Sequence, residues 1–99
     1  MVLLIDLGFA VWKEQRVRLA EIDCPAMDEA EGPAAYEYVR NQLAKAEYVM
    51  VKTNKIDIYG RYVGHIFYSL QEGLGKVEVF EKGRYLNREL VEKGLAVVL

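Results

Sequence analysis

The stretch from Arg16 to Pro25 constrains the fold more than any other part of the chain. Val17 and Leu19 alternate with polar and small residues, which is the period-two pattern of a strand with one face toward a core. The proline ends this strand, because it has no N–H for the ladder and favours extended geometry in the preceding residue. The sequence therefore predicts a half-buried strand that stops at a rigid corner, with Arg18 and Asp23 close to that corner.

One long helix is predicted after this corner. Gly32-Pro33 opens it, since a proline in the first turn lacks only a donor that has no helical partner. Apolar residues then recur at spacings of three and four, namely Tyr36, Val39, Leu43 and Ala46. This stripe is typical of a helix that packs one face against a sheet.

The remaining sequence predicts short β runs and a second helix. The expected elements are a strand over 48–53, a turn-rich connection over 54–60, a strand over 61–68, a hairpin arm over 77–83 and a final strand over 95–99. The run 61–68 is apolar on both faces, which favours a central strand. A short helix carrying Leu90 and Val91 is expected to begin at Asn87 as the N-cap and to stop at Gly94.

These elements indicate a mainly β chain with helices, in the α+β class. Antiparallel strands with one main helix at an end, plus a second short helix, fit a five-stranded barrel of the OB type in a single domain over residues 1–99. The chain opens and closes on β runs without turn signals, so we expect an OB barrel that is truncated at both ends. The edges exposed in this way would allow homo-oligomers to form by strand pairing.

Composition limits the possible functions. The chain has 99 residues, 53% of them hydrophobic, which fits a small globular domain, and its formal charge of −2 argues against binding by bulk positive charge while permitting a local basic patch. Cys24 and His65 are the only cysteine and histidine, so neither an internal disulfide nor a zinc cluster is expected. No signal peptide or membrane span is predicted, and a cytoplasmic location is the default expectation.

Arg18, Arg61 and Asp23 are the main candidates for chemistry. A planar guanidinium group forms bidentate hydrogen bonds to two phosphate oxygens, and a carboxylate suits a hard cation. The spacing of five places Arg18 and Asp23 on opposite faces of an unbroken strand, so they converge only if the strand bends or ends near Ile22. The simpler alternative is that the arginines pair with Asp23 or Glu21 on the surface, and that Asp23 caps a turn.

Four stretches together resemble the staphylococcal nuclease-like (thermonuclease) family. They are Val17-Arg-Leu-Ala-Glu-Ile-Asp-Cys-Pro25, Gly32-Pro-Ala-Ala35, Asp57-Ile-Tyr-Gly-Arg61 and Leu86-Asn-Arg-Glu-Leu-Val-Glu-Lys-Gly-Leu-Ala96, in the family's order over most of the chain. The resemblance implies an OB fold and calcium-dependent hydrolysis of phosphodiester bonds in DNA or RNA. It also implies that Arg18 and Arg61 grip the scissile phosphate as catalytic residues and that Asp23 binds Ca²⁺.

The sequence departs from the family pattern at the site itself. The family's glutamate after Asp-x-Pro, which orients or deprotonates the attacking water, is replaced by Ala26. The family's Asp-Gly-Asp-Thr motif, which supplies another calcium ligand, has no counterpart here, and neither do the C-terminal helix and its tyrosines. These departures predict a weak or inactive nuclease, with a non-catalytic nucleic-acid or protein binding module as the alternative.

Several other residues near these motifs have two interpretations. Asp28, Glu29 and Glu31 either replace the missing glutamate or form a solvated loop. Tyr59 and Tyr62 flank the Gly60-Arg61 pair and either stack on bases or, for Tyr59, pack over the turn. His65 is interpreted as a core or edge residue and Cys24 as a thiol without a positioned base, so neither is expected to be catalytic.

Overall fold

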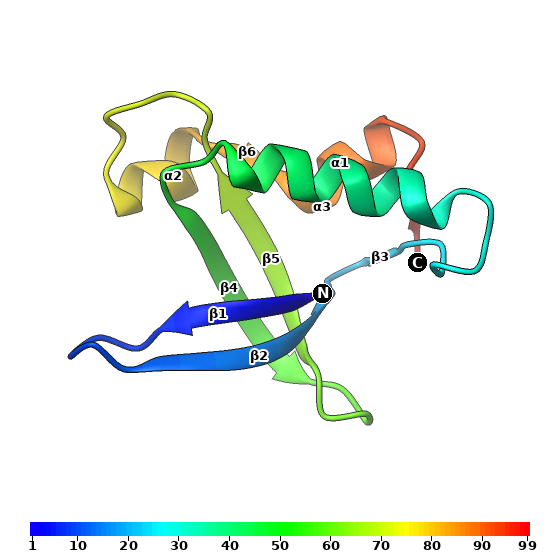
Figure 1. Cartoon of the computed structure of the whole chain (residues 1–99), viewed down its shortest axis with the longest axis horizontal. Coiled ribbons are helices and arrows are strands. Elements are labelled where there is room, and N and C mark those ends of the chain that lie inside the picture. Colours follow the sequence, from blue (N-terminus) through cyan, green and yellow to red (C-terminus); the bar gives the residue numbers. More distant parts are fainter.

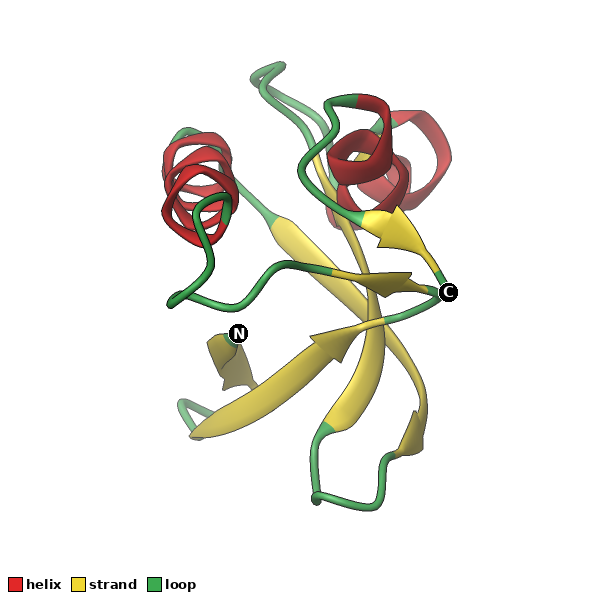
Figure 2. Ribbon diagram, turned by 90° about the vertical axis from the view of Figure 1, so that its right-hand side faces the viewer, coloured by secondary structure: helices red, strands yellow, loops and turns green.

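The computed structural model describes the backbone of residues 1–99 and the side chains of residues 1–53 and 55–99. Its elements in chain order are β1 (Val2–Asp6), β2 (Trp12–Leu19), β3 (Ile22–Asp23), α1 (Gly32–Ala44), β4 (Val49–Ile56), β5 (Tyr62–Tyr68), α2 (Lys76–Lys82), β6 (Arg84–Tyr85), α3 (Leu86–Glu92) and β7 (Val97–Val98). The helices gather over one end of the strands (Figures 1 and 2).

The strands form an open, mixed sheet. Its path is β1-β2-β5-β4, β6 pairs with β5, and β3 pairs with β7 in a separate two-stranded sheet. The expected α+β class with a five-stranded sheet is confirmed, although the described strands do not close into the ring of a barrel. The expectation of antiparallel strands throughout is wrong at one place, because β2 and β5 pair in parallel. The connection between them contains α1 and β4, which gives it the length that a parallel pairing requires.

β5 is the central strand, as its apolar sequence predicts. It pairs with β2 on one side and β4 on the other, and Ile66 and Tyr68 are fully buried. The core around them is formed by Leu19, Ile22, Leu86, Leu90 and Ala96, with Val39 and Leu43 of α1 packed against it. The helical stripe predicted from the sequence therefore lies over the core, and Gly94 has the positive φ of +73° expected at the stop after α3.

Helix α2 occupies Lys76–Lys82, so the hairpin arm predicted over 77–83 is wrong. Glu78 accepts a hydrogen bond from the Gly75 N–H at 3.1 Å, which satisfies a donor at the start of α2. Val79 is buried, and Phe80 packs against Phe67 of β5 at a ring-centroid distance of 5.3 Å. The alternating valines looked like a strand because a helix of two turns presents too few residues for its period to be read.

The turn-rich connection predicted over 54–60 is shorter than expected. β4 continues to Ile56, and its pairing with β5 shifts between Thr53 and Lys55. Such an irregularity lets a strand absorb one extra residue without losing its register. The turn itself therefore falls within residues 57–61.

Asn87 is not the N-cap of the second helix, which is a correction to the sequence prediction. The α3 helix starts at Leu86, and the Asn87 side chain is 1% exposed. Its Oδ1 accepts from the Ile66 N–H at 3.1 Å, and its Nδ2 donates to the carbonyls of Ala20 at 3.0 Å and Gly64 at 3.1 Å. The pairing of β2 with β5 ends at Gly64, so the next backbone groups of β5 have no strand beside them on that side. The Asn87 side chain supplies the hydrogen bonds that such a strand would make.

Glu89 of α3 connects this helix to α1 and to the central strand β5. Its Oε1 accepts from the hydroxyl of Tyr38 at 2.5 Å and from that of Tyr68, and its Oε2 accepts from Arg84 Nε at 2.7 Å. Burial acts to raise the pKa of the Glu89 carboxyl, but the bonds from Arg84 and the two tyrosines lower it overall. Burial and the bond to Glu89 raise the pKa of both hydroxyls. We call Asn87, Glu89 and their partners the α3 cluster.

The two outermost strands of the sheet path are β1 and β4. Leu3 to Asp6 of β1 and Val49 to Val51 of β4 line a common cavity of about 490 Å³. The hairpin that carries β1 also exposes large apolar side chains, with Phe9 fully exposed and Trp12 more than half exposed. Among the described residues, no helix has the length and apolar character needed to cross a bilayer.

Candidate functional site

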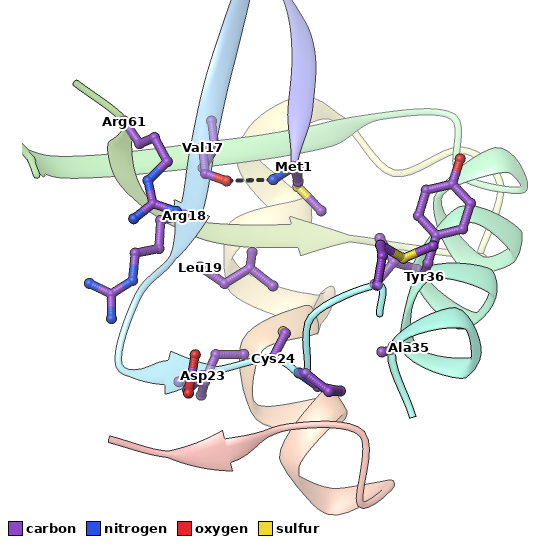
Figure 3. A pocket seen from close by; sticks show the side chains of 14 residues that line it. Met1, Val17, Arg18, Leu19, Asp23, Cys24, Ala35, Tyr36 and Arg61 are labelled. Carbon is purple, nitrogen blue, oxygen red and sulfur yellow. Dashed lines mark hydrogen bonds between the residues drawn. The ribbon is translucent and has the colours of Figure 1, made fainter. Parts of the chain in front are cut away.

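A cavity of about 300 Å³ lies where β2, β3 and α1 meet, and it brings the three main candidate residues together. Arg18, Arg61 and Asp23 all line it. Figure 3 shows the two arginines and Asp23 on one side of the cavity, and Ala35 and Tyr36 of α1 on the other. The cavity therefore has a charged side on the strands and an apolar side on the helix. We call Arg18, Asp23 and Arg61 the pocket rim.

A sharp bend between β2 and β3 brings Asp23 to the same cavity as Arg18. β2 ends at Leu19, and Glu21 has a φ of +67°, a left-handed conformation that turns the chain. Asp23 then pairs with Val97 of β7 instead of continuing along β5. The convergence predicted from the spacing is observed, but the bend lies at residues 20 and 21, before the Cys24-Pro25 corner.

Arg61 is held by Asp57, a partner that the sequence reading missed. Oδ1 of Asp57 accepts from the backbone N–H groups of Tyr59 at 2.9 Å and Arg61 at 3.0 Å, and Oδ2 accepts from Arg61 Nε at 2.8 Å. Desolvation acts to raise the pKa of Asp57, but these hydrogen bonds and the Arg61 charge lower it overall. The aspartate thus organises the turn and orients the guanidinium. Its position at the start of an Asp-x-x-Gly turn was the available signal.

Arg18 and Asp23 are less constrained. Among the described side chains neither has a hydrogen-bond or ion-pair partner, and Asp23 is exposed. The alternative in which the arginines pair with Asp23 or Glu21 is therefore not what the structure contains. The amino group of Met1 also lines the cavity, where it donates to the Val17 carbonyl at 2.9 Å, and burial and the Arg61 charge lower its pKa.

The family model described as "Staphylococcal nuclease homologue" matches residues 16–99. The chain belongs to the staphylococcal nuclease homologue family. This confirms the resemblance, and it supports a nuclease-type domain with an OB fold of a family that binds nucleic acid. Among curated proteins, no sequence matches this chain.

The position of the family's glutamate is exposed. Ala26 lies between Pro25 and Met27, which both line the cavity. Its carbonyl accepts from the Glu29 N–H at 2.9 Å, and a Cβ on Gly32 would lie only 2.0 Å from the same oxygen. Backbone contacts therefore fix this corner against the start of α1, whatever the side chain at position 26.

The nearby acidic loop borders a neighbouring cavity rather than this one. Glu29 and Glu31 line a space of about 330 Å³, together with Asp23 and Cys24, while Asp28 is exposed and lines neither cavity. A carboxylate replacing the missing glutamate would have to approach the arginines from this second space.

The donor set does not fit a Ca²⁺ ion. Calcium takes about six to eight oxygen ligands, whereas Asp23 is the one carboxylate that lines the cavity with the arginines. No cluster of three or more His, Cys, Asp or Glu suited to a metal exists among the described side chains. The described side chains around this cavity therefore do not supply the ligand set that the calcium-dependent members of the family would need.

The two candidate tyrosines lie in different environments. Tyr59 is 74% exposed, and the guanidinium carbon of Arg61 lies 5.3 Å from its ring centroid. Tyr62 is half-buried at the start of β5, opposite Val17 and Ile56. Tyr59 therefore extends the surface around Arg61, whereas Tyr62 belongs to the sheet.

Cys24 lines the same cavity as the pocket rim, whereas His65 does not. Desolvation and the nearby Asp23 raise the pKa of the Cys24 thiol, which disfavours the nucleophilic thiolate. His65 is half-buried in β5, and its Nδ1 lies 2.6 Å from the Tyr85 hydroxyl.

Proposed function

We propose that this nuclease-family domain binds a phosphodiester group of DNA or RNA at the pocket rim and cleaves it slowly or not at all. The observation that carries the proposal is that Arg18 and Arg61 line one cavity with a single carboxylate, Asp23, and without a glutamate at position 26. Two guanidinium groups suit phosphate oxygens, whereas one carboxylate is a poor metal site.

The two arginines contribute differently to binding in this proposal. Asp57 bonds to Nε of Arg61, so the guanidinium is held before a ligand arrives and little side-chain freedom is lost on binding. Arg18 has no such partner among the described side chains, so it loses more side-chain freedom when phosphate binds. Tyr59, which lies beside Arg61, adds a surface on which a base can stack.

Catalysis is the second candidate, favoured by membership of the nuclease family. Its family form is calcium-dependent hydrolysis, in which charge building on the phosphate is stabilised by the arginines. A positioned general base contributes typically about 10²–10⁴ in rate, and Ala26 cannot supply one. We therefore propose binding as the main activity and residual cleavage as the weaker one.

A binding experiment tests the main proposal. The affinity of a fluorescent trinucleotide, measured by anisotropy, is expected to fall about tenfold in Arg61→Lys, because lysine cannot bind phosphate in the paired geometry. Arg40→Lys on α1 is the matched control and should bind like the parent chain. Equal affinities in all three proteins would exclude the pocket rim as a phosphate site and leave a protein-binding role.

A cleavage experiment separates the two candidates. Single-stranded DNA and RNA are incubated with the parent chain and with Ala26→Glu, each with Ca²⁺ or with chelator. We expect calcium-dependent cleavage by the parent at or below the detection limit and a rate in the variant within about tenfold of that limit, since glutamate adds a base but not a second carboxylate ligand. A cleavage rate 10²-fold or more above this limit would show that only the glutamate was missing, and would favour catalysis as the main activity.

We also propose that chains associate through the outer edges of β1 and β4. These strands lie at the two ends of the sheet path and border the 490 Å³ cavity. Unpaired strand edges next to apolar surface favour pairing between chains. Light scattering should detect a dimer or larger species at high concentration, and a monomer at all concentrations would refute this.

A further inference from the structure

The face of the sheet opposite the core presents cations and aromatic rings next to Arg18. Strand register defines this face, because residues opposite one another on paired strands point the same way. Val63 lies opposite both Arg18 and Lys55, Lys52 lies opposite His65, and Tyr85 lies opposite Phe67. We call this surface the outer face and include in it Arg88 of α3. Its members are Lys52, Lys55, His65, Phe67, Tyr85 and Arg88.

The aromatic rings of the outer face form a continuous row. His65 and Tyr85 stack at 5.8 Å, Tyr85 and Phe67 stack at 5.0 Å, and Phe80 of α2 follows Phe67 at 5.3 Å. The first three are half-buried and Phe80 is 38% exposed, so part of the row faces solvent. A row of this kind offers apolar and π surface to a planar ligand.

The cations of this face lie on both sides of the aromatic row. Lys52 and Lys55 are exposed on β4, and the Arg88 guanidinium lies 5.7 Å from the Tyr85 ring centroid. Glu21 is an acidic side chain near Tyr85, and burial together with the Glu21 charge raises the Tyr85 pKa. The chain as a whole carries a charge of −2, so this concentration of positive charge suits a polyanion.

We propose that the outer face is a second binding surface, on which a single strand of nucleic acid continues from the Arg18–Arg61 pocket across β5 to Arg88. Arg18 joins the two sites, because it lines the pocket and lies in the first register row of the face. The proposal rests on the proposed function for the identity of the ligand. Lys52, Lys55 and Arg88 contact phosphates, and the aromatic row contacts bases.

A single strand fits this surface better than a duplex. Aromatic side chains contribute to single-strand binding because the unpaired base exposes its π face, and one OB fold covers about 4–16 nucleotides. In a duplex the bases are stacked on each other, and only the phosphate contacts remain. The combination of rings and cations therefore indicates a single strand.

The test compares a trinucleotide, which fills only the pocket, with a single strand of about 12 nucleotides, which spans both sites. Lys52→Gln/Arg88→Gln removes two cations of the outer face. We expect it to weaken the long strand about tenfold, to leave the trinucleotide unchanged, and to reduce the salt slope of log K by about 1.4, since each phosphate contact on a single strand contributes about 0.7.

The matched control is Arg40→Gln/Lys45→Gln, which removes the same charge from α1 and its end. The apolar stripe of α1 packs against the core, and the Arg40 side chain on this helix is exposed to solvent. The control should bind both ligands like the parent chain. Phe80→Leu, which removes the end ring of the row but keeps an apolar side chain, should weaken the long strand about threefold.

Two results would overturn the proposal. One is an unchanged affinity for the long strand in the outer-face variant. The other is an equal loss in the variant and its control, which would indicate general attraction by charge. Failure of the proposed function looks different, because Arg61→Lys would then bind the trinucleotide as well as the parent does.

Discussion

The pocket rim and the α3 cluster are both built from charged and polar side chains, but they are completed in opposite ways. In the α3 cluster, Asn87 makes three hydrogen bonds to the backbone and Glu89 accepts from three side chains. At the pocket rim, Arg61 is bound to Asp57 through Nε, while Arg18 and Asp23 have no partner among the described side chains.

This difference separates the groups that hold the fold from the groups that meet a ligand. Buried polar groups stabilise a domain only when their bonds are complete, and removing one partner leaves the others unsatisfied. Groups at a binding site keep donors and acceptors for the ligand and contribute little to stability. Substitutions in the α3 cluster should therefore change stability, and those at the pocket rim should change binding.

Asn87→Ala should have the largest effect on stability. It removes three hydrogen bonds and leaves the Ile66 N–H and the Ala20 carbonyl without their side-chain partner inside the protein. At about 1–3 kcal/mol for each buried unsatisfied group, we expect a loss of roughly 4 kcal/mol in the free energy of unfolding, measured by urea titration. Asn41→Ala on the exposed side of α1 is the control. A loss below about 1 kcal/mol would contradict the role of Asn87 as a strand substitute.

Gly32→Ala should come next and should affect both stability and binding. The new Cβ would lie 2.0 Å from the Ala26 carbonyl oxygen and 2.8 Å from the Met27 Cα, so the Pro25 corner must move. Overpacking of this kind costs typically about 1–3 kcal/mol, and the displaced corner should also weaken trinucleotide binding. Gly73→Ala is a control in a loop with open space around its Cα, although its positive φ carries a strain of its own. Unchanged stability and binding in Gly32→Ala would refute the close approach.

Glu89→Gln should change the pH dependence of stability. The folded-state pKa of Glu89 is lowered, so its stabilisation is present above the unfolded pKa of about 4.3 and is lost as the pH falls through the folded value. The variant should be about 2 kcal/mol less stable at pH 7, and its stability should fall less between neutral pH and about pH 3. Denaturant titrations at several pH values measure this. Glu92→Gln, exposed on the same helix, should keep the parent profile.

Arg18→Gln should have the smallest effect on stability. Because Arg18 has no partner among the described side chains, we expect a change within about 0.5 kcal/mol. Trinucleotide binding should still fall several-fold, since one of two phosphate-binding guanidinium groups is gone. A stability loss above about 1.5 kcal/mol would show that the pocket rim also holds the fold, and the comparison with the α3 cluster would fail.

The sequence predicted those parts of the structure that depend on local patterns. The strand that carries Val17 and Leu19, the helix after Gly32, the central strand before Ser69 and the stop at Gly94 all follow from period, proline or glycine, whereas the end of that first strand lies at Leu19 and not at the Pro25 corner. The convergence of Arg18 and Asp23 was also predictable, because spacing and a strand end together determine which faces meet.

The parts that could not be predicted depend on distant partners. Asn87 resembles an N-cap in sequence, and only the missing neighbour of β5 explains why its side chain is buried. The helix at Val79 forms because Phe80 packs against Phe67, a contact that no local pattern contains. The parallel pairing of β2 with β5 likewise follows from a connection made by α1 and β4.

The contacts of Ala26 have a consequence for how such a domain changes over evolutionary time. Its carbonyl accepts a hydrogen bond from the Glu29 N–H, and Gly32 packs against it. The contacts that hold this position are therefore made by a backbone carbonyl, which every amino acid has. Exchange of the side chain alters the chemistry and leaves the scaffold intact. Under the proposed function, one substitution at this position removes the general base without displacing the arginines that bind phosphate, so selection can act on hydrolysis and on binding independently.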